Sequence, residues 1–120
     1  MTPLTRTILI VDDHPSFRAS ARRMLEGEGY RVVGEAADGA EALRAARELE
    51  PEVILLDVRL PDLDGFAVAR RITGRAPAPA VILISSREVN EWGGAVADAG
   101  ALGFISKADL SGPAMEALLV

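Results

Sequence analysis

The sequence predicts an α/β fold, a doubly wound sandwich of five β-α units around a parallel sheet with strand order 2-1-3-4-5. Five short apolar runs alternate with amphipathic stretches along the 120 residues. Four of these runs are nearly continuous in apolar residues, which is typical of strands that a parallel sheet buries on both faces. Hydrophobic residues make up 49% of the chain and charged residues 26%, a composition that excludes disorder. The length predicts a single domain over residues 1–120.

The apolar runs place the predicted strands at 8–11, 30–33, 53–56, 81–84 and 102–105. The second run carries a charged residue, Arg31, and we therefore expect it to form the exposed edge of the sheet.

The first three predicted helices begin and end at recognisable residues. Pro15 opens the first helix, because proline is tolerated in a first helical turn, and Gly27 lies at its end. Asp38 and Glu41 have the spacing of a capping box and open the second helix. Asp64 is positioned to cap the third helix.

Two further helices are predicted in the C-terminal half. A stripe of residues at helical spacing defines the fourth helix: Val89, Trp92, Val96 and Ala99. Gly93 and Gly94 weaken its middle by about 1 kcal/mol each. The fifth helix is expected from about Leu110 to the chain end, with Pro113 in its first turn.

Composition excludes several functional classes. The net charge of −5 argues against direct nucleic-acid binding, which needs a basic surface. No segment approaches the roughly 20 apolar residues that cross a bilayer, and no secretory signal is expected. Cysteine is absent, so disulfides are excluded, and a cytoplasmic location is expected.

Polar side chains follow four of the predicted strands. Asp12 and Asp13 follow the first, Asp57 the third, Ser85 the fourth and Lys107 the fifth. The carboxyl ends of parallel strands meet at one rim, where α/β sheets bind ligands. Three carboxylates and one ammonium leave surplus negative charge there. Oxygen ligands favour a hard cation, and Mg²⁺ is the expected one.

Simpler interpretations exist for each of these residues. The acid pair could cap the helix that begins at Pro15, Asp57 could be a turn residue, and Ser85 could form a capping box with Glu88. His14 could act as a base or ligand, although a histidine before a helix more often packs or caps. Lys107 could be a solvated charge, but it is the one lysine beside twelve arginines, which indicates a chemical role.

The chain resembles the receiver domain of bacterial two-component response regulators along essentially its whole length. The segments that carry the resemblance are 8–15 (ILIVDDHP), 55–65 (LLDVRLPDLDG), 84–86 (ISS) and 103–107 (GFISK). The resemblance implies the flavodoxin-like form of the predicted fold.

The resemblance also implies a role for each residue at the rim. Asp57 would accept a phosphoryl group from the phosphohistidine of a sensor histidine kinase or phosphotransfer protein. Asp13, Asp57 and the backbone carbonyl of Arg59 would bind Mg²⁺, or Mn²⁺ as a substitute, with Asp12 acting through water. Lys107 would pair with Asp57 and then with its phosphate.

The implied output is a conformational signal. Ser85 would donate a hydrogen bond to the new phosphoryl group, and Phe104 would swing inward behind it. The face of the fourth helix, fifth strand and fifth helix would change, and this face or that of the first and fifth helices would support a homodimer. The chain would catalyse only its own phosphoryl transfer and slow dephosphorylation. Its start, Asp12-Asp13-His14-Pro15, resembles that of receivers that often precede a DNA-binding helix-turn-helix domain, which implies a role in transcription regulation.

Departures from the family pattern and rival functions complete the sequence-based interpretation. Ala108 replaces the proline that commonly follows the lysine, and Arg59 and Arg87 occupy positions that influence phosphate lifetime. An aspartate-nucleophile phosphatase would need a second aspartate where Arg59 stands. A dinucleotide site would need glycines where the chain has two acids, and a cobalamin module would need glycine at Phe17. The remaining alternative is a degenerate receiver, a phosphate-independent interaction module.

Overall fold

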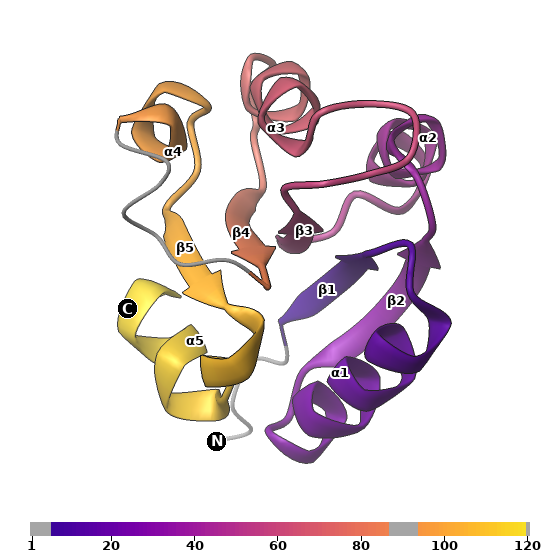
Figure 1. Cartoon of the computed structure of the whole chain (residues 1–120), viewed down its shortest axis with the longest axis vertical. Helices are drawn as coiled ribbons and strands as arrows, with labels where there is room; N and C mark the ends of the chain where they lie inside the picture. Colours follow the sequence, from indigo (N-terminus) through magenta and orange to yellow (C-terminus); the bar gives the residue numbers. More distant parts are fainter. Residues whose placement is uncertain (1–5, 87–93, 120) are drawn as a thin grey trace.

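The computed structural model describes residues 6–86 and 94–119. Its five strands form one parallel sheet in the order β2-β1-β3-β4-β5, which confirms the predicted topology (Figure 1). The strands are β1 (Thr7–Val11), β2 (Arg31–Ala36), β3 (Val53–Asp57), β4 (Ala80–Ser85) and β5 (Gly103–Ser106). β2 lies at the edge of the sheet and is partly exposed, as Arg31 predicted.

The helices cover both faces of the sheet. They are α1 (Pro15–Gly27), α2 (Gly39–Leu49), α3 (Gly65–Thr73), α4 (Ala95–Asp98) and α5 (Gly112–Leu119), and a 3₁₀ turn, η2 (Lys107–Asp109), follows β5. α1 and α5 lie on one face, and α2, α3 and α4 lie on the other (Figure 1). Within the described residues, no helix combines the length and apolar character of a membrane span.

The predicted helix starts are found where the sequence places them. Pro15 occupies the first position of α1. The Asp38 carboxylate accepts a hydrogen bond from the Glu41 N–H at 2.8 Å. The Glu41 carboxylate in turn accepts from the Ala37 N–H at 3.3 Å. In a standard capping box the donor would be the N–H of the cap residue, Asp38, so here it is shifted by one residue. Asp64 caps α3 by accepting from the Phe66 N–H.

The last two helices differ in part from their predicted bounds. α5 begins two residues after Leu110, because η2 intervenes and the Ser111 hydroxyl caps the new start by accepting from the Ala114 N–H at 3.2 Å. Pro113 lies in the first turn, as expected. The described part of α4 covers Ala95–Asp98. Residues 87–93, which include Arg87, Glu88, Val89, Trp92 and Gly93, lie outside the described residues.

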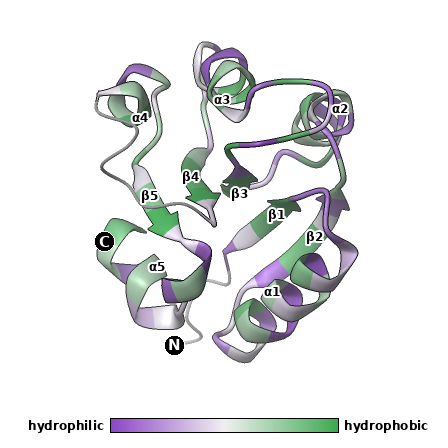
Figure 2. Ribbon diagram, viewed as in Figure 1, coloured by the Kyte–Doolittle hydropathy of each residue, from purple (hydrophilic) through white to green (hydrophobic). Residues whose placement is uncertain are grey.

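The sheet separates two apolar cores. Side chains of successive strand residues alternate between them, so that Ile8 and Ile10 pack toward α1 and α5 while Leu9 and Val11 pack toward α2 and α3. All four are fully buried. Figure 2 shows hydrophobic residues along the strands, while the helices carry both hydrophobic and hydrophilic residues. This two-faced burial explains why the central strands are continuous in apolar residues.

Candidate functional site

The carboxyl rim of the sheet brings the predicted polar residues together. Asp12 follows β1, Asp57 ends β3, Ser85 ends β4 and Lys107 follows β5. The Lys107 Nζ lies 2.5 Å from Oδ2 of Asp12 and 3.2 Å from Oδ2 of Asp57. Asp12, Asp57 and Ser85 are 0%, 4% and 2% exposed. Lys107 is therefore an ion-pair partner of buried acids, which excludes the solvated-charge interpretation.

Asp57 resists ionisation more than an ordinary aspartate. The pKa of Asp57 is raised from 3.8 to about 6, mainly by burial and also by the neighbouring Asp12 carboxylate. The Arg59 N–H and the Lys107 ammonium act in the opposite direction. The Arg59 N–H donates to Oδ1 of Asp57 at 3.0 Å, so Asp57 also forms the turn that the simpler interpretation proposed. A cation at this position would favour the ionised form.

Asp12 and Lys107 form the charged pair of the site. Burial alone would raise the pKa of Asp12, but hydrogen bonds from Lys107 and from the His14 backbone N–H lower it below its ordinary value. Burial would likewise lower the pKa of Lys107, but Asp12 and Asp57 raise it above its ordinary value. Asp12 and Lys107 therefore stay charged at neutral pH.

The donor set at the rim fits a divalent cation. Asp12, Asp13, His14 and Asp57 each offer a ligand atom, and these atoms all lie within 4.8 Å of one another. Asp13 is partly exposed, with 36% of its side chain accessible, so the cluster opens to solvent on that side. Carboxylate oxygens in a cluster with an open side are typical of Mg²⁺ sites, where the ion keeps several of its waters.

His14 is closer to the acids than the sequence suggested. Its Nδ1 lies 3.0 Å from Oδ1 of Asp12 and 3.1 Å from Oδ1 of Asp13. Its backbone N–H also donates to Oδ1 of Asp12 at 2.8 Å. The imidazole thus orients the acid pair from the solvent side.

Two residues of α1 support the site and were not recognised as site residues from the sequence. The Arg18 guanidinium donates to the backbone carbonyl of Asp12 at 2.6 Å and to Glu35 on β2 at 3.0 Å. The Phe17 ring lies under the Lys107 ammonium, 4.6 Å from the ring centroid. Both lie near the start of α1, shortly after the acid pair, but this proximity in the sequence does not by itself identify them as site residues.

The predicted switch residues lie on adjacent strands. Ser85 ends β4 and is paired with Ser106 of β5, and Phe104 of β5 is paired with Leu83. Ser85 is buried within the rim, whereas Phe104 is half-buried and packs against the core shared by α3 and α4. The two side chains are thus linked through neighbouring strand positions.

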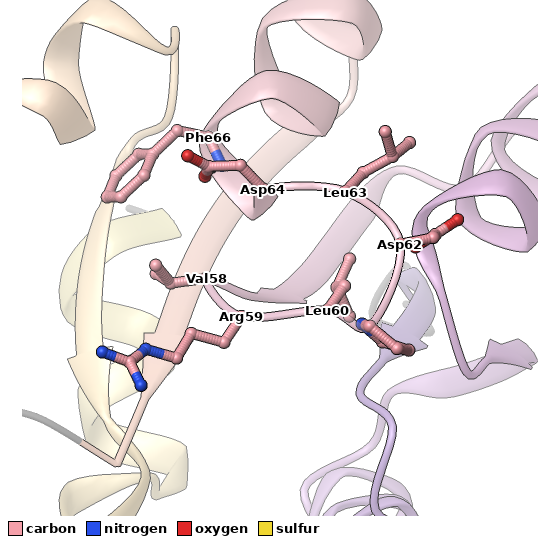
Figure 3. A pocket seen from close by; sticks show the side chains of 8 residues that line it. Val58, Arg59, Leu60, Asp62, Leu63, Asp64 and Phe66 are labelled. Atoms are coloured by element: carbon pink, nitrogen blue, oxygen red, sulfur yellow. The ribbon is translucent and has the colours of Figure 1, made fainter.

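The loop between β3 and α3 borders the site. It surrounds a hollow of about 460 Å³ lined by Val58, Arg59, Leu60, Pro61, Asp62, Leu63, Asp64 and Phe66. In Figure 3 the Asp62 side chain points toward α2, and the Arg59 side chain points to the opposite side of the loop. The Asp62 carboxylate accepts from the backbone N–H groups of Gly39 and Ala40.

Comparisons with known proteins give one consistent family. Residues 8–112 match the family model of the response regulator receiver domain. The response regulator GacA of Pseudomonas viridiflava is 37% identical over 101 residues, which cover 83% of this chain and 47% of that protein. A protein-glutamate methylesterase/protein-glutamine glutaminase of Anaeromyxobacter dehalogenans is 39% identical over 119 residues, which cover 96% of this chain and 33% of that protein.

A solved structure agrees with these relatives. The LuxR-family two-component response regulator of Aurantimonas sp. SI85-9A1 has a TM-score of 0.87 and 35% identity, over 97% of this chain and 86% of that one. The chain spans about half or less of the length of the curated relatives that it matches.

Proposed function

The chain belongs to the response regulator receiver domain family, and from this membership we propose that it is a phosphorylation-dependent signalling switch whose phosphoacceptor is Asp57. The observation that carries the proposal is the environment of this carboxylate. Asp57 is buried at the end of β3, beside Asp12, with the ammonium of Lys107 3.2 Å from its Oδ2. A carboxylate nucleophile that lies between one acid and one cation can accept a phosphoryl group from an anionic donor once a second cation, a metal ion, binds beside it.

The proposed reaction moves one phosphoryl group from nitrogen to oxygen. A carboxylate oxygen of Asp57 attacks the phosphorus of a phosphohistidine on a sensor histidine kinase or phosphotransfer protein. The new P–O bond forms as the P–N bond breaks, and the electron pair of that bond returns to the imidazole, which takes up a proton. Positioning and charge neutralisation supply the catalysis, because such transition states need little covalent assistance. Lys107 neutralises part of the charge that gathers on the phosphoryl oxygens.

The donor cluster fits Mg²⁺, with Mn²⁺ as a substitute. Asp13, Asp57 and the backbone carbonyl of Arg59 would hold the ion directly, and Asp12 would hold it through water. The ion would supply positive charge between the Asp57 carboxylate and the incoming phosphoryl group. The raised pKa of Asp57 supports this assignment, since burial beside Asp12 leaves its ionised form under-compensated.

The conformational response would pass through Ser85 and Phe104. A hydroxyl at the end of β4 can donate to a phosphoryl oxygen on Asp57, because Asp57 and Ile84 are paired across β3 and β4. Movement of Ser85 leaves room for the half-buried Phe104 ring to turn inward. The face of α4, β5 and α5 would thereby shift between two states. This face, or that of α1 and α5, would also support a homodimer.

The output of the whole protein is expected to reside elsewhere in its chain. Relatives of this receiver include transcription regulators and a methylesterase, and their receiver segments cover half or less of each protein. We infer a cytoplasmic protein in which the receiver controls such an output, with transcription regulation as the expected one.

Intact-mass spectrometry tests the phosphoacceptor. Acetyl phosphate with Mg²⁺ should add one phosphoryl group to the wild-type chain, and hydroxylamine or base should remove it, because an acyl phosphate is labile. Asp57→Asn should prevent the addition. As a matched control, Asp109→Asn, an exposed acid in the η2 turn, should leave it intact. A base-stable phosphate on Ser85 or Ser86 would refute the mechanism, and an unmodified wild-type chain would favour a phosphate-independent interaction module.

A further inference from the structure

A backbone hydrogen bond joins the two ends of the loop over residues 58–64. The Gly65 N–H donates to the Val58 carbonyl at 2.8 Å. A side chain at Gly65 would collide with the Asp57 carbonyl and come within 2.7 Å of the Val58 Cα, so glycine is required for this close approach. This contact therefore fixes the two ends of the loop, but it does not fix the position of its far end, around Asp62.

The far end of the loop is fastened to α2 by Asp62. Its two carboxylate oxygens accept from the N–H groups of Gly39 at 2.7 Å and Ala40 at 3.0 Å, which are the first two residues of α2 (Figure 3). A carboxylate at a helix N-terminus is favoured by the charge of the free N–H groups. Leu63 packs beside this contact, since a Cβ on Gly39 would lie 2.7 Å from its Cδ1. The loop therefore packs directly against the buried backbone of Gly39.

Arg59, a residue of the proposed cation site, lies in the loop between Val58 and Asp62. Arg59 holds the Asp57 carboxylate through its N–H, and it forms an isolated bridge with Asp64 across the loop. On the proposed function, the carbonyl of the same residue is a ligand of Mg²⁺. A backbone ligand has no rotamer of its own, so its position depends entirely on how the loop is held.

We propose that Asp62 is a positioning residue for the cation site: by fastening the β3–α3 loop to α2, it sets the Arg59 carbonyl in place before the cation binds. This inference rests on the proposed function. Asp62 also satisfies two backbone N–H groups at the start of α2, but α2 has a cap residue of its own, Asp38, which accepts from the Glu41 N–H. The contact of Asp62 with α2 spans 22 and 23 positions of sequence, and it therefore couples the loop to a helix outside the site.

Calorimetric titration with Mg²⁺ separates positioning from simple capping. Asp62→Ala should weaken Mg²⁺ binding on the order of tenfold, the lower end of the losses known for residues that orient metal ligands. Asp62→Asn keeps one acceptor oxygen and should bind with intermediate affinity. Asp38→Ala is the matched control, since it removes a cap from the same helix without touching the loop. It should lower stability but leave Mg²⁺ affinity unchanged.

Amide hydrogen exchange supplies a second readout, because coupling is reciprocal. Mg²⁺ should slow exchange at Gly39 and Ala40 in the wild type and in Asp38→Ala, and should not do so in Asp62→Ala. If Asp62→Ala does not fold, Asp62→Asn decides both measurements. Wild-type affinity in the Asp62 variants, or an equal loss in Asp38→Ala, would overturn the inference while leaving the proposed function intact. Absence of Mg²⁺ binding in the wild type would overturn the proposed function, and the inference with it.

Discussion

Replacing Asp57 by asparagine should stabilise the metal-free protein at neutral pH. The pKa of Asp57 is raised from 3.8 to about 6 by burial and by the neighbouring Asp12, so above about pH 6 the carboxyl is ionised in the fold at a cost that the unfolded chain does not carry. Each pKa unit corresponds to about 1.4 kcal/mol, which gives an upper value of about 3 kcal/mol for ionising Asp57 in the fold. An amide of the same shape removes this cost.

The sign of the pH dependence follows from the direction of the shift. Below about pH 4 the carboxyl is neutral in both states, and the variant and the wild type should be equally stable. Between pH 4 and 6 the wild type loses stability as pH rises, and above 6 the full difference is present. We expect about 1–3 kcal/mol at pH 7.5, since the neighbouring side chains relax, and an increase in melting temperature on the order of 4–12 °C.

Urea unfolding followed by far-UV circular dichroism, in a chelating buffer at both ends of this pH range, measures the difference. Asp13→Asn is the matched control: its side chain is 36% exposed, and its effect on metal-free stability should be small. Saturating Mg²⁺ should narrow the gap by stabilising the wild type alone. A variant less stable than the wild type at neutral pH, or a gap that does not depend on pH, would refute the electrostatic reasoning.

Three further outcomes are expected. Lys107→Arg should fold, bind Mg²⁺ and accept phosphate, but it should lose much of the amide-shift response around Phe104, because the planar guanidinium cannot replace a compact ammonium; a full response by NMR would place Lys107 outside the switch. Gly65→Ala should cost at least about 2 kcal/mol in urea unfolding, since a Cβ meets the Asp57 carbonyl, whereas Gly27→Ala, where nothing lies within 4 Å, should be nearly neutral or stabilising. Asp13→Asn should abolish or strongly weaken the calorimetric Mg²⁺ signal, and an unchanged heat signature contradicts the assignment of Asp13 as a ligand.

The sheet and the location of the site could be predicted from the sequence because both follow from periodicity. A parallel sheet buried on both faces requires continuous apolar runs, and five such runs alternating with helical stretches predicted a doubly wound fold. The strand order 2-1-3-4-5 is that of the usual small form of this fold. Parallel strands carry their carboxyl ends to one rim, so residues such as Asp12, Asp57 and Lys107 had to meet there. The lysine among twelve arginines marked the same place through composition.

The supporting contacts could not be predicted, because they join surfaces whose relative placement only the packed fold determines. Asp62 is an exposed loop acid in sequence terms, indistinguishable from a solvated one until Gly39 is seen beside it. Arg18 is one of many arginines on helix surfaces, and only its contact with the Asp12 carbonyl distinguishes it. Ser111 is a typical helix-capping residue and could have indicated that α5 begins at Gly112. The apolar pattern favoured an earlier start, near Leu110.

The division of the interior by the sheet has a consequence for how this molecule can change over evolutionary time. Ile105 packs toward α1 and α5, while its neighbour Phe104 packs toward α3 and α4. A substitution that repacks one compartment therefore leaves the other nearly undisturbed, because the backbone hydrogen bonds of the strands stand between them. The surfaces above the two compartments can acquire new partners independently. Only the rim borders both compartments, so a substitution there affects both of them.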